Sequence, residues 1–416
     1  MHGDPRPPQG VLSRRSSPVH VSIRHPLPAA RSATRVFLPC SGLGRQRRGF
    51  ETFTLECAEA LHPEPGIDLT VFAGGPVAEW PVRVLRNLPR DSVAAMALAR
   101  LHGRGSYYTE QATFFLSLVP HLVRERPDVV YFADLNLGNL CWHFRRATGL
   151  RYRLLYYNGG LSTMPFTRSD FVQQLTPAGL AEATARGEDL SRMTVLPHGV
   201  RLPSTVPPRI IGAERAALGL PVDRPIVLSV GLLDREVKRM DYLIREVAAL
   251  PAPRPFLCLL GAESTETAEV RALATALLGE SGVMLATVPH GSIGDFYRAA
   301  DVFALCSLRE GFGLAYVEAL GHGLDVVAHA TPVTRFILGD QARLVDLART
   351  GVASLALAAA LAAAPGDAVR HARHAAARAR FGWDALRGQY AALLTSVAAM
   401  APLDSSTSHA SHMALP

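Results

Sequence analysis

Short apolar runs of strand length alternate with segments of helical periodicity along most of this chain. Helical segments such as Glu51–Leu61 and Gln111–Arg126 separate the runs. This alternation predicts parallel sheets with right-handed crossovers, whose buried strands are apolar on both faces. We therefore expect strands at Arg35–Pro39, Ile67–Phe72, Val129–Phe132, Arg153–Tyr157 and Thr194–Leu196, and then at Ile226–Val230, Phe256–Leu260, Val283–Ala286, Val302–Leu305 and Val326–Ala328.

The length of 416 residues favours two α/β domains, and a Pro-rich segment divides the chain near its middle. We expect a first, acceptor-side domain over 33–197, a hinge over 198–208 and a second, donor-side domain over 209–380. A terminal helix over 381–401 is expected to pack back on the first domain. Residues 1–32 and 402–416 lack periodicity and are expected to be a disordered basic extension and a disordered tail.

The charge of the chain is concentrated at its beginning. The formal net charge is +7, and residues 1–50 hold nine arginines against one acid, Asp4, which leaves the remainder near neutral. A net positive charge that comes mainly from one terminal segment is no general argument for nucleic-acid binding. Five scattered cysteines without a CxxC pair favour a reducing compartment, and no secretory signal is recognised. We expect a cytoplasmic protein with at most peripheral membrane contact. No helix with Lys or Arg along one face is recognised, which favours a soluble acceptor.

The most informative segment is a polar, Gly-rich loop between an apolar run and a helix. The loop contains Arg309, Glu310 and Gly311, and a second carboxylate, Glu318, follows on the helix. Glycines let backbone N–H groups approach a ligand, and a helix start offers free N–H donors and a positive dipole end. The pattern predicts an anion site suited to a diphosphate.

These residues resemble the family 4 retaining glycosyltransferases, a GT-B group marked by two glutamates separated by seven residues. The match is EGFGLAYVE from Glu310 to Glu318, with AAD before the strand, GLDVVAH after the helix and the hinge motif LPHGV. The resemblance covers about residues 35–400. It implies an α/β fold of GT-B architecture, with two Rossmann-like, doubly wound parallel-sheet domains facing across a cleft. It also implies a nucleotide-sugar donor and retention at the anomeric carbon, with Glu310 on the sugar and Glu318 on the ribose. The diphosphate would lie on Gly311, Phe312, Gly313 and Leu314.

Lys238 is the only lysine in the chain; the other 42 basic residues are arginines. Its ammonium is a compact, rotatable charge that can bridge phosphate oxygens, and the family resemblance places a catalytic, donor-phosphate lysine here. A solvated helix lysine is the simpler alternative. The family usually carries an arginine directly after the strand-ending glycine, where this chain has Leu232. Arg235 or Arg239 would then supply the second donor-binding charge.

A second Gly-rich loop, with Gly42 and Gly44, follows the first expected strand and leads into a helix. The resemblance makes it the loop under the donor. Arginines at this loop, among them Arg48, suggest an anionic donor or acceptor group, although solvated side chains explain Arg45 and Arg47 equally well.

Polar residues follow two further strands of the first half. Asp134 and Asn136 come after Val129–Phe132, and Asn158 ends the next run. Asp134 or Asn158 is a candidate for orienting the transferred sugar, because the histidine that the family often has before the Asp134 position is Ala133 here. Asn136 and Asn158 are candidate acceptor-side residues. Helix capping is an equally good explanation for Asp134 and Asn136.

No acidic pair or histidine cluster at a strand end suggests a metal, so we expect no metal and no cofactor besides the nucleotide-sugar co-substrate. The predicted function is transfer of a sugar to a polysaccharide intermediate or a small natural product. Three alternatives stay open: a sugar–nucleotide enzyme of related fold such as an epimerase, a non-catalytic nucleotide-sugar-binding protein, and binding of nucleic acid or membrane through the basic front.

Overall fold

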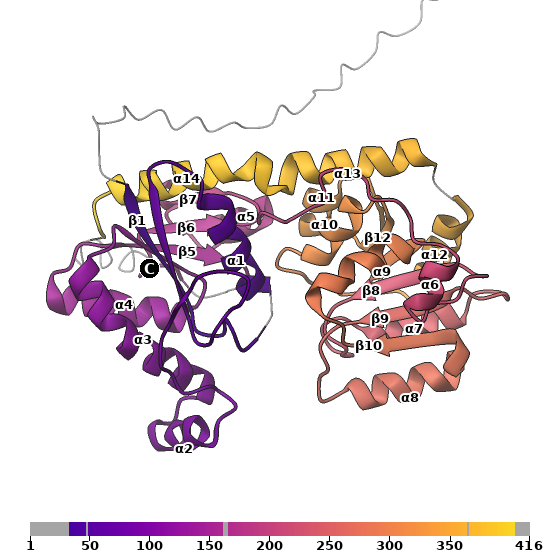
Figure 1. Cartoon of the computed structure of the whole chain (residues 1–416), viewed down its shortest axis with the longest axis horizontal. Helices are drawn as coiled ribbons and strands as arrows, with labels where there is room; N and C mark the ends of the chain where they lie inside the picture. Colours follow the sequence, from indigo (N-terminus) through magenta and orange to yellow (C-terminus); the bar gives the residue numbers. More distant parts are fainter. Residues whose placement is uncertain (1–32, 47–48, 161–164, 364–365, 404–416) are drawn as a thin grey trace, which may run out of the picture. The chain divides into compact units, whose positions relative to one another are not determined.

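A computed structural model of the chain describes residues 33–46, 49–160, 165–363 and 366–403. Among these residues, seven parallel strands form a first sheet in the order β3-β2-β1-β4-β5-β6-β7 (Figure 1). In β1, Val36 pairs with Leu69 on one side and Val129 on the other, so β1 lies inside the sheet and its middle residues are buried. The strands are β1 Thr34–Cys40, β2 Ile67–Ala73, β3 Arg83–Val84, β4 Val129–Phe132, β5 Arg153–Asn158, β6 Phe171–Gln174 and β7 Met193–Val195.

The helices of the first half begin and end at residues with clear capping chemistry. Ser92 accepts a hydrogen bond from Ala95 N at the start of α2, and Gly103 ends this helix with φ of 70°. Thr176 caps α5, whose first residue is Pro177. The helices are α1 Gly49–Leu61, α2 Val93–His102, α3 Ser106–Glu125, α4 Leu135–Thr148 and α5 Pro177–Ala185.

The second half of the described chain repeats this construction with six parallel strands in the order β10-β9-β8-β11-β12-β13. Its strands are β8 Ile226–Val230, β9 Phe256–Leu260, β10 Val283–Ala286, β11 Val302–Leu305, β12 Asp325–His329 and β13 Arg343–Val345. Its helices are α6 Ala213–Ala217, α7 Met240–Ala248, α8 Thr267–Leu278, α9 Ile293–Ala299, α10 Leu314–Gly321, α11 Pro332–Leu338 and α12 Val352–Ala363.

Two further helices complete the described chain: α13 (Asp367–Phe381) and α14 (Trp383–Ala399), coloured yellow in Figure 1. α13 packs on α10 of the second half, whereas α14 packs on α1, β1 and β4 of the first. Tyr390 of α14 is fully buried, accepts a hydrogen bond from Gln173 Nε2 at 3.0 Å and donates one to Pro197 O at 2.7 Å. Apolar side chains of α14 thereby extend the core of the first sheet.

The structure confirms the predicted fold class: both sheets are parallel, and helices separate most successive strands. Among the described residues, no helix lies between β2 and β3 or between β5 and β6. Sequence patterns missed β3, β6 and β13. In β6, Gln173 and Gln174 are buried although they are polar, and Gln173 is paired with Leu196 O at 2.8 Å. Within the described residues, no single helix has the length and hydropathy of a membrane span. Only α12 and α13 taken together, as a pair of helices with a sharp bend between them, reach that length and hydropathy.

The order of connections reverses once in each sheet. In the first sheet the reversal lies between β1 and β4, and in the second between β8 and β11. Loops at the carboxyl ends of such strand pairs separate from each other and leave the crevice in which open α/β folds bind ligands. The predicted site residues Gly42, Asp134, Lys238 and Glu310 all lie in the four loops that follow these strands.

Candidate functional site

The loop after β8 is built around the buried carboxylate of Asp234. Asp234 Oδ1 accepts hydrogen bonds from Val237 N at 3.1 Å and Lys238 N at 2.6 Å. The backbone carbonyl of Asp234 accepts a hydrogen bond from Met240 N at 2.9 Å, at the start of α7. These bonds satisfy backbone donors of a tight loop and fix the position from which the Lys238 side chain extends.

Lys238 reaches across to the loop that follows β11. Its Nζ lies 2.6 Å from Glu310 Oε1, and the side chains are 20% and 11% exposed. Gly231 leaves space for the extended Lys238 side chain, because a Cβ at position 231 would lie 3.2–3.3 Å from Cγ, Cδ and Cε of Lys238. The two residues predicted to act on the donor thus form a largely buried ion pair, whose remaining exposed edge is available to a ligand.

Arg235 and Arg239 were expected to replace the arginine that is missing at position 232, but their side chains contact other groups. The Arg239 guanidinium donates to Leu347 O at 2.8 Å and lies 4.3 Å from the centre of the Tyr242 ring. Arg235 forms an ion pair with the exposed Glu269, and its backbone N donates to Glu266 at 2.6 Å. Leu232 itself is 40% exposed. Both guanidinium groups therefore have other partners, and Lys238 supplies the positive charge beside Glu310.

The loop after β11 brings backbone N–H groups to the same place. Gly313 has a φ of 86°, a conformation that disfavours side chains, and it precedes α10 without any side-chain cap. The first N–H groups of α10, beginning with Leu314, thus lack a side-chain cap. A Cβ on Gly311 would lie 2.6 Å from Gly159 O, so only glycine fits there. An uncapped helix start of this kind suits an anion.

Phe312, predicted as a donor-binding residue, has a buried side chain. Its ring lies 5.7 Å from the ring of His198 and 5.7 Å from that of Phe381. Burial lowers the pKa of His198 to about 3, so this histidine is neutral. The Phe312 side chain therefore anchors the loop on the hinge and on α13, and only its backbone remains for a ligand.

Glu318 lies on the second turn of α10, in a partly buried environment. Tyr297 of α9 donates a hydrogen bond to Glu318 Oε2 at 2.7 Å, and the His322 ring stacks on Tyr297 at 5.0 Å. Burial raises the pKa of the Glu318 carboxyl, against the opposing effect of the Tyr297 hydroxyl. A carboxylate held in this way retains unused lone pairs for a ligand hydroxyl.

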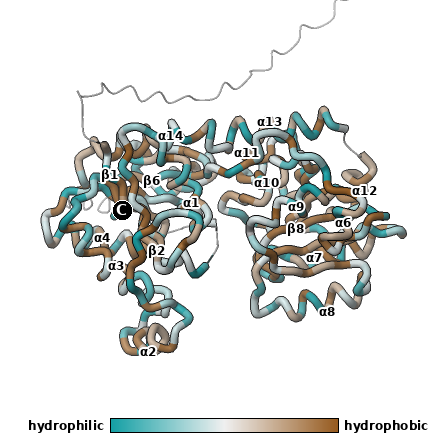
Figure 2. The backbone as a smooth tube through the Cα atoms, viewed as in Figure 1, coloured by the Kyte–Doolittle hydropathy of each residue, from teal (hydrophilic) through white to brown (hydrophobic). Residues whose placement is uncertain are grey.

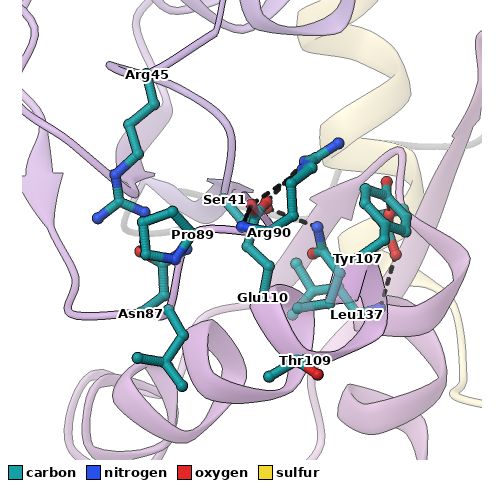
Figure 3. A network of polar contacts seen from close by, with 12 residues as sticks. Ser41, Arg45, Asn87, Pro89, Arg90, Tyr107, Thr109, Glu110 and Leu137 are labelled. Atoms are coloured by element: carbon teal, nitrogen blue, oxygen red, sulfur yellow. Dashed lines mark hydrogen bonds and ion pairs between the residues drawn. The ribbon is translucent and has the colours of Figure 1, made fainter. Parts of the chain in front are cut away.

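The switch point of the first sheet holds a polar network around Glu110 of α3 (Figure 3). Arg90 donates to both Glu110 oxygens, from Nη2 at 2.7 Å and from Nε at 3.0 Å, and Ser41 Oγ donates at 2.8 Å. Although burial raises the pKa of Glu110, Arg90 and Ser41 outweigh it and the net pKa is lowered. The Arg90 guanidinium lies 4.3 Å from the centre of the Tyr107 ring. The charge of Arg90 is therefore matched by an ionised Glu110.

Asp134 and Asn136 lie at the start of α4. Asp134 Oδ1 accepts hydrogen bonds from Asn136 N at 2.8 Å and Leu137 N at 3.1 Å, and its Oδ2 accepts one from the Tyr107 hydroxyl. Burial raises the pKa of Asp134, and these three bonds act against it. Asp134 is thus the N-cap of α4, the alternative that the sequence left open.

The other candidates of the first half are Asn158, Gly42, Gly44 and Arg48. Asn158 donates to Gln174 Oε1 at 2.8 Å, and its own Oδ1 is buried without a hydrogen-bond partner among the residues that the structure describes. Gly44 has a φ of 83°, and a Cβ on Gly42 would lie 2.4 Å from Glu51 Oε1. The loop therefore requires glycine at position 44, where a Cβ would also lie 2.4 Å from the backbone of Gly75, whereas at position 42 the Glu51 side chain would have to move. Arg48 lies outside the described residues.

A cavity of about 390 Å³ opens beside Gly44, between α1 and the segment after β2. Glu56, Glu59, Trp80 and Arg201 contribute to its lining. Arg201 N and Trp383 Nε1 donate to Glu56 Oε2 at 2.8 and 3.0 Å, and Arg201 also pairs with Glu59. Burial raises the pKa of Glu56. Carboxylates and an indole ring together can hold a polyhydroxylated molecule through hydrogen bonds and apolar contact.

Sequence reasoning did not find Arg90, Tyr107, Glu110 or Tyr297. They lie on helices or on the segment after β3 and contact residues of other elements: Ser41 and Glu110 are 69 positions apart, and Tyr297 and Glu318 are 21 apart. Capping and Gly-rich patterns therefore carry no signal for them. Among the described residues, no group of His, Cys, Asp or Glu side chains has an arrangement that could hold a metal ion.

Part of the chain matches a known family of proteins. Residues 211–361 match the family model described as glycosyl transferases group 1. The D-inositol 3-phosphate glycosyltransferase of Xylanimonas cellulosilytica is 40% identical over 214 residues, which are 48% of this chain and 50% of that protein. The enzyme of the same name from Thermobispora bispora is 34% identical over 224 residues, which are 49% and 50% of the two chains. The chain spans about half the length of these relatives.

Solved structures resemble the chain over most of its length. Sucrose-phosphate synthase of Thermosynechococcus elongatus has a TM-score of 0.72 at 19% identity, and covers 88% of this chain and 99% of its own. HepE of Anabaena, solved in complex with UDP-glucose, has a TM-score of 0.65 at 19% identity over 87% and 99%. The chain therefore has the GT-B fold of these proteins, and its second half carries the segment described by the group 1 glycosyl transferase model.

Proposed function

We propose that the chain is a family 4 retaining glycosyltransferase that moves a sugar from a nucleoside-diphosphate sugar to an acceptor. The observation that carries the proposal is the Lys238–Glu310 ion pair, which lies at the β8/β11 switch point beside the start of α10. The resemblance of 211–361 to group 1 glycosyl transferases and the UDP-glucose complex of HepE support it. On this proposal 33–197 is the acceptor-side domain and 209–380 the donor-side domain.

The donor diphosphate would lie on Lys238 and the amides from Gly311 to Leu314. As the bond between the anomeric carbon and the phosphate oxygen breaks, negative charge develops on the departing diphosphate. Fixed donors at such a position each contribute typically about 3–4 kcal/mol of transition-state stabilisation. Diphosphate binding to Lys238 would free Glu310 to contact the sugar, and Glu318 would hold the ribose hydroxyls.

The acceptor oxygen would attack the same face that the diphosphate leaves, with retention of configuration. The acceptor proton would pass to the departing diphosphate oxygen, so that no protein base is needed. No step requires a divalent cation.

We place the acceptor in the cavity beside Gly44, where Glu56 and Trp80 can contact a polyhydroxylated ring. A polysaccharide intermediate, a small natural product and the inositol phosphate named for the relatives all belong to this class. Tyr107, at the start of α3, donates a hydrogen bond to Asp134 in the loop after β4.

The Glu318→Gln variant tests the proposed ribose contact. A carboxyl whose folded pKa lies above its unfolded pKa destabilises the fold increasingly as pH rises from the unfolded to the folded value. Glu318→Gln is therefore expected to unfold at a higher temperature than the wild type near neutral pH, and this advantage should shrink at acidic pH. Its nucleotide affinity is expected to fall roughly tenfold to a hundredfold, since a charged hydrogen bond contributes about 1.5–3 kcal/mol. Thermal unfolding against pH and nucleotide titration measure the two effects. Lower stability at neutral pH together with unchanged affinity would contradict this role of Glu318.

Turnover tests the proposed reaction itself. The full chain is incubated with UDP-, GDP-, dTDP- and ADP-sugars and with inositol phosphates, oligosaccharides and small polyols as acceptors, and nucleoside diphosphate release is followed. The proton NMR coupling of the new anomeric centre is expected to match that of the donor. Nucleotide binding without turnover of any donor would favour the non-catalytic binding protein, and an inverted anomer would exclude retention.

A further inference from the structure

Helix α2 (Val93–His102) exposes most of its apolar side chains. Val93 is 79% exposed and Leu101 84% exposed, and Met96 and Leu98 add 42% and 38%. Ala95 is the buried residue of this helix. Figure 1 draws α2 beyond the end of α3, away from the strands of the first sheet, and Figure 2 shows its hydrophobic character. Soluble surfaces rarely gather large apolar side chains in this way without a partner.

Val93, Ala97, Leu98 and Leu101 lie on one side of the helix, and Met96 lies outside this group. Val93, Ala97 and Leu101 follow each other at four-residue intervals, and Leu98 lies beside Leu101. In an α-helix this spacing gives a continuous stripe. Ala95 and Ala99 lie on the opposite side, where α2 packs against α3. The small alanines allow close packing there and leave the large side chains to the solvent.

Positive charge borders this stripe. Arg100 lies on α2 and Arg104 in the turn that follows, both exposed, and Arg86 precedes the helix. Within the described part of the chain, none of these three arginines forms an ion pair. Residues 83–104 contain five arginines and a single acid, Asp91. Arg104 lies 4.6 Å from the centre of the Tyr108 ring, a contact that keeps its positive charge. The segment thus combines an apolar stripe with arginines whose charge is not matched by a described carboxylate.

We propose that α2 docks the protein on an anionic lipid bilayer, with Val93, Leu98 and Leu101 entering the interface and Arg100 and Arg104 contacting lipid phosphates. An amphipathic helix with these two features lies in the plane of a membrane surface, and each Arg near an anionic surface adds to the binding. The sequence patterns gave no prediction for this helix. This docking is independent of the proposed reaction.

A second copy of the chain fits the stripe less well. Two copies meeting through α2 would bring Arg100 and Arg104 of one chain toward the same residues of the other. A stable interface also needs about 800 Å² from each partner, and a ten-residue helix is about 15 Å long. Charge and size together favour the lipid surface.

Vesicle sedimentation of the full chain tests the proposal. Vesicles of phosphatidylcholine alone are compared with vesicles that contain about a third phosphatidylglycerol, at low salt and at roughly 0.5 M salt, where charge effects between exposed groups are strongly screened. The variants are V93S/L101S and R100E/R104E. The matched controls are Leu355→Ser, at a leucine 75% exposed on α12, and Arg349→Glu, at an exposed arginine of the second half. The basic segment 1–50 is present in every protein, so differences between variants report on α2.

The wild type is expected to sediment with anionic vesicles and not with phosphatidylcholine. V93S/L101S should lower the partition coefficient at least tenfold at both salt concentrations. R100E/R104E should lower it at least threefold at low salt, and both controls should match the wild type. Equal sedimentation of V93S/L101S and wild type would overturn the proposal. So would a wild type that does not sediment, or a wild-type dimer in sedimentation velocity that V93S/L101S converts to a monomer.

Discussion

Lys238→Ala is expected to lower kcat/KM for the nucleotide-sugar donor by about 10²–10³, the range found when one fixed transition-state donor is removed. Lys238 contributes the positive charge beside Glu310, since Arg235 and Arg239 have other partners. Steady-state kinetics with the identified donor measures the loss. The stabilisation of the protein by nucleoside diphosphate should decrease in parallel.

Two further variants distinguish a role of Lys238 in acting on the donor from a role in stabilising the fold. Lys238→Ala also leaves the carboxylate of Glu310, 11% exposed, without its partner, and part of any loss of stability comes from there. The double variant K238A/E310Q should regain that stability without regaining activity. Arg349→Ala, which removes an exposed cation elsewhere in the same half, should leave the kinetics unchanged. Full activity of Lys238→Ala would show that the lysine does not act on the donor.

The largest effect on stability is expected from Asp170→Ala. The Asp170 carboxylate is fully buried and pairs with Arg145, which is 5% exposed. It also accepts hydrogen bonds from Leu154 N at 2.7 Å and from Leu403 N at 2.6 Å. Removing the carboxylate leaves a buried guanidinium unpaired, which costs about 3–5 kcal/mol. The free energy of unfolding from urea titration measures this loss.

Asp68→Ala is the matched control for this variant, because Asp68 lies on β2 of the same sheet with its side chain exposed. A change within about 0.5 kcal/mol is expected there. If Asp170→Ala lost no more stability than Asp68→Ala, the buried pair would contribute nothing net to the fold.

Apolar strands made the fold predictable from the sequence. The run at Ile226–Val230 occurs as predicted, because a buried parallel strand must be apolar on both faces. Strand β6 was missed for the converse reason: Gln173 and Gln174 are polar, and their burial depends on partners such as Tyr390, 217 positions away from Gln173. Local patterns carry no information about such contacts.

In the candidate site, too, single residues could be predicted from local patterns, whereas their contacts could not. Gly-rich loops after strands and the single lysine drew attention to Lys238 and Glu310, yet nothing in the sequence indicates that these two, 72 positions apart, form an ion pair. The network of Arg90 and Glu110 likewise depends on the β1/β4 switch point, which exists only once the strand order is known. The surface of α2 could not be predicted, because exposure is a property of the packed structure.

Nucleotide binding by the full chain tests the central claim most directly. Thermal unfolding is recorded with UDP, GDP, dTDP and ADP and their sugars, for the wild type and for Lys238→Ala. At a hundredfold excess over its dissociation constant, a true ligand adds about 2.7 kcal/mol of stability. The account predicts that one nucleotide class stabilises the wild type in this way and that Lys238→Ala loses the response. No stabilisation by any of them at millimolar concentration, or an equal response in both proteins, would contradict a donor site at Lys238.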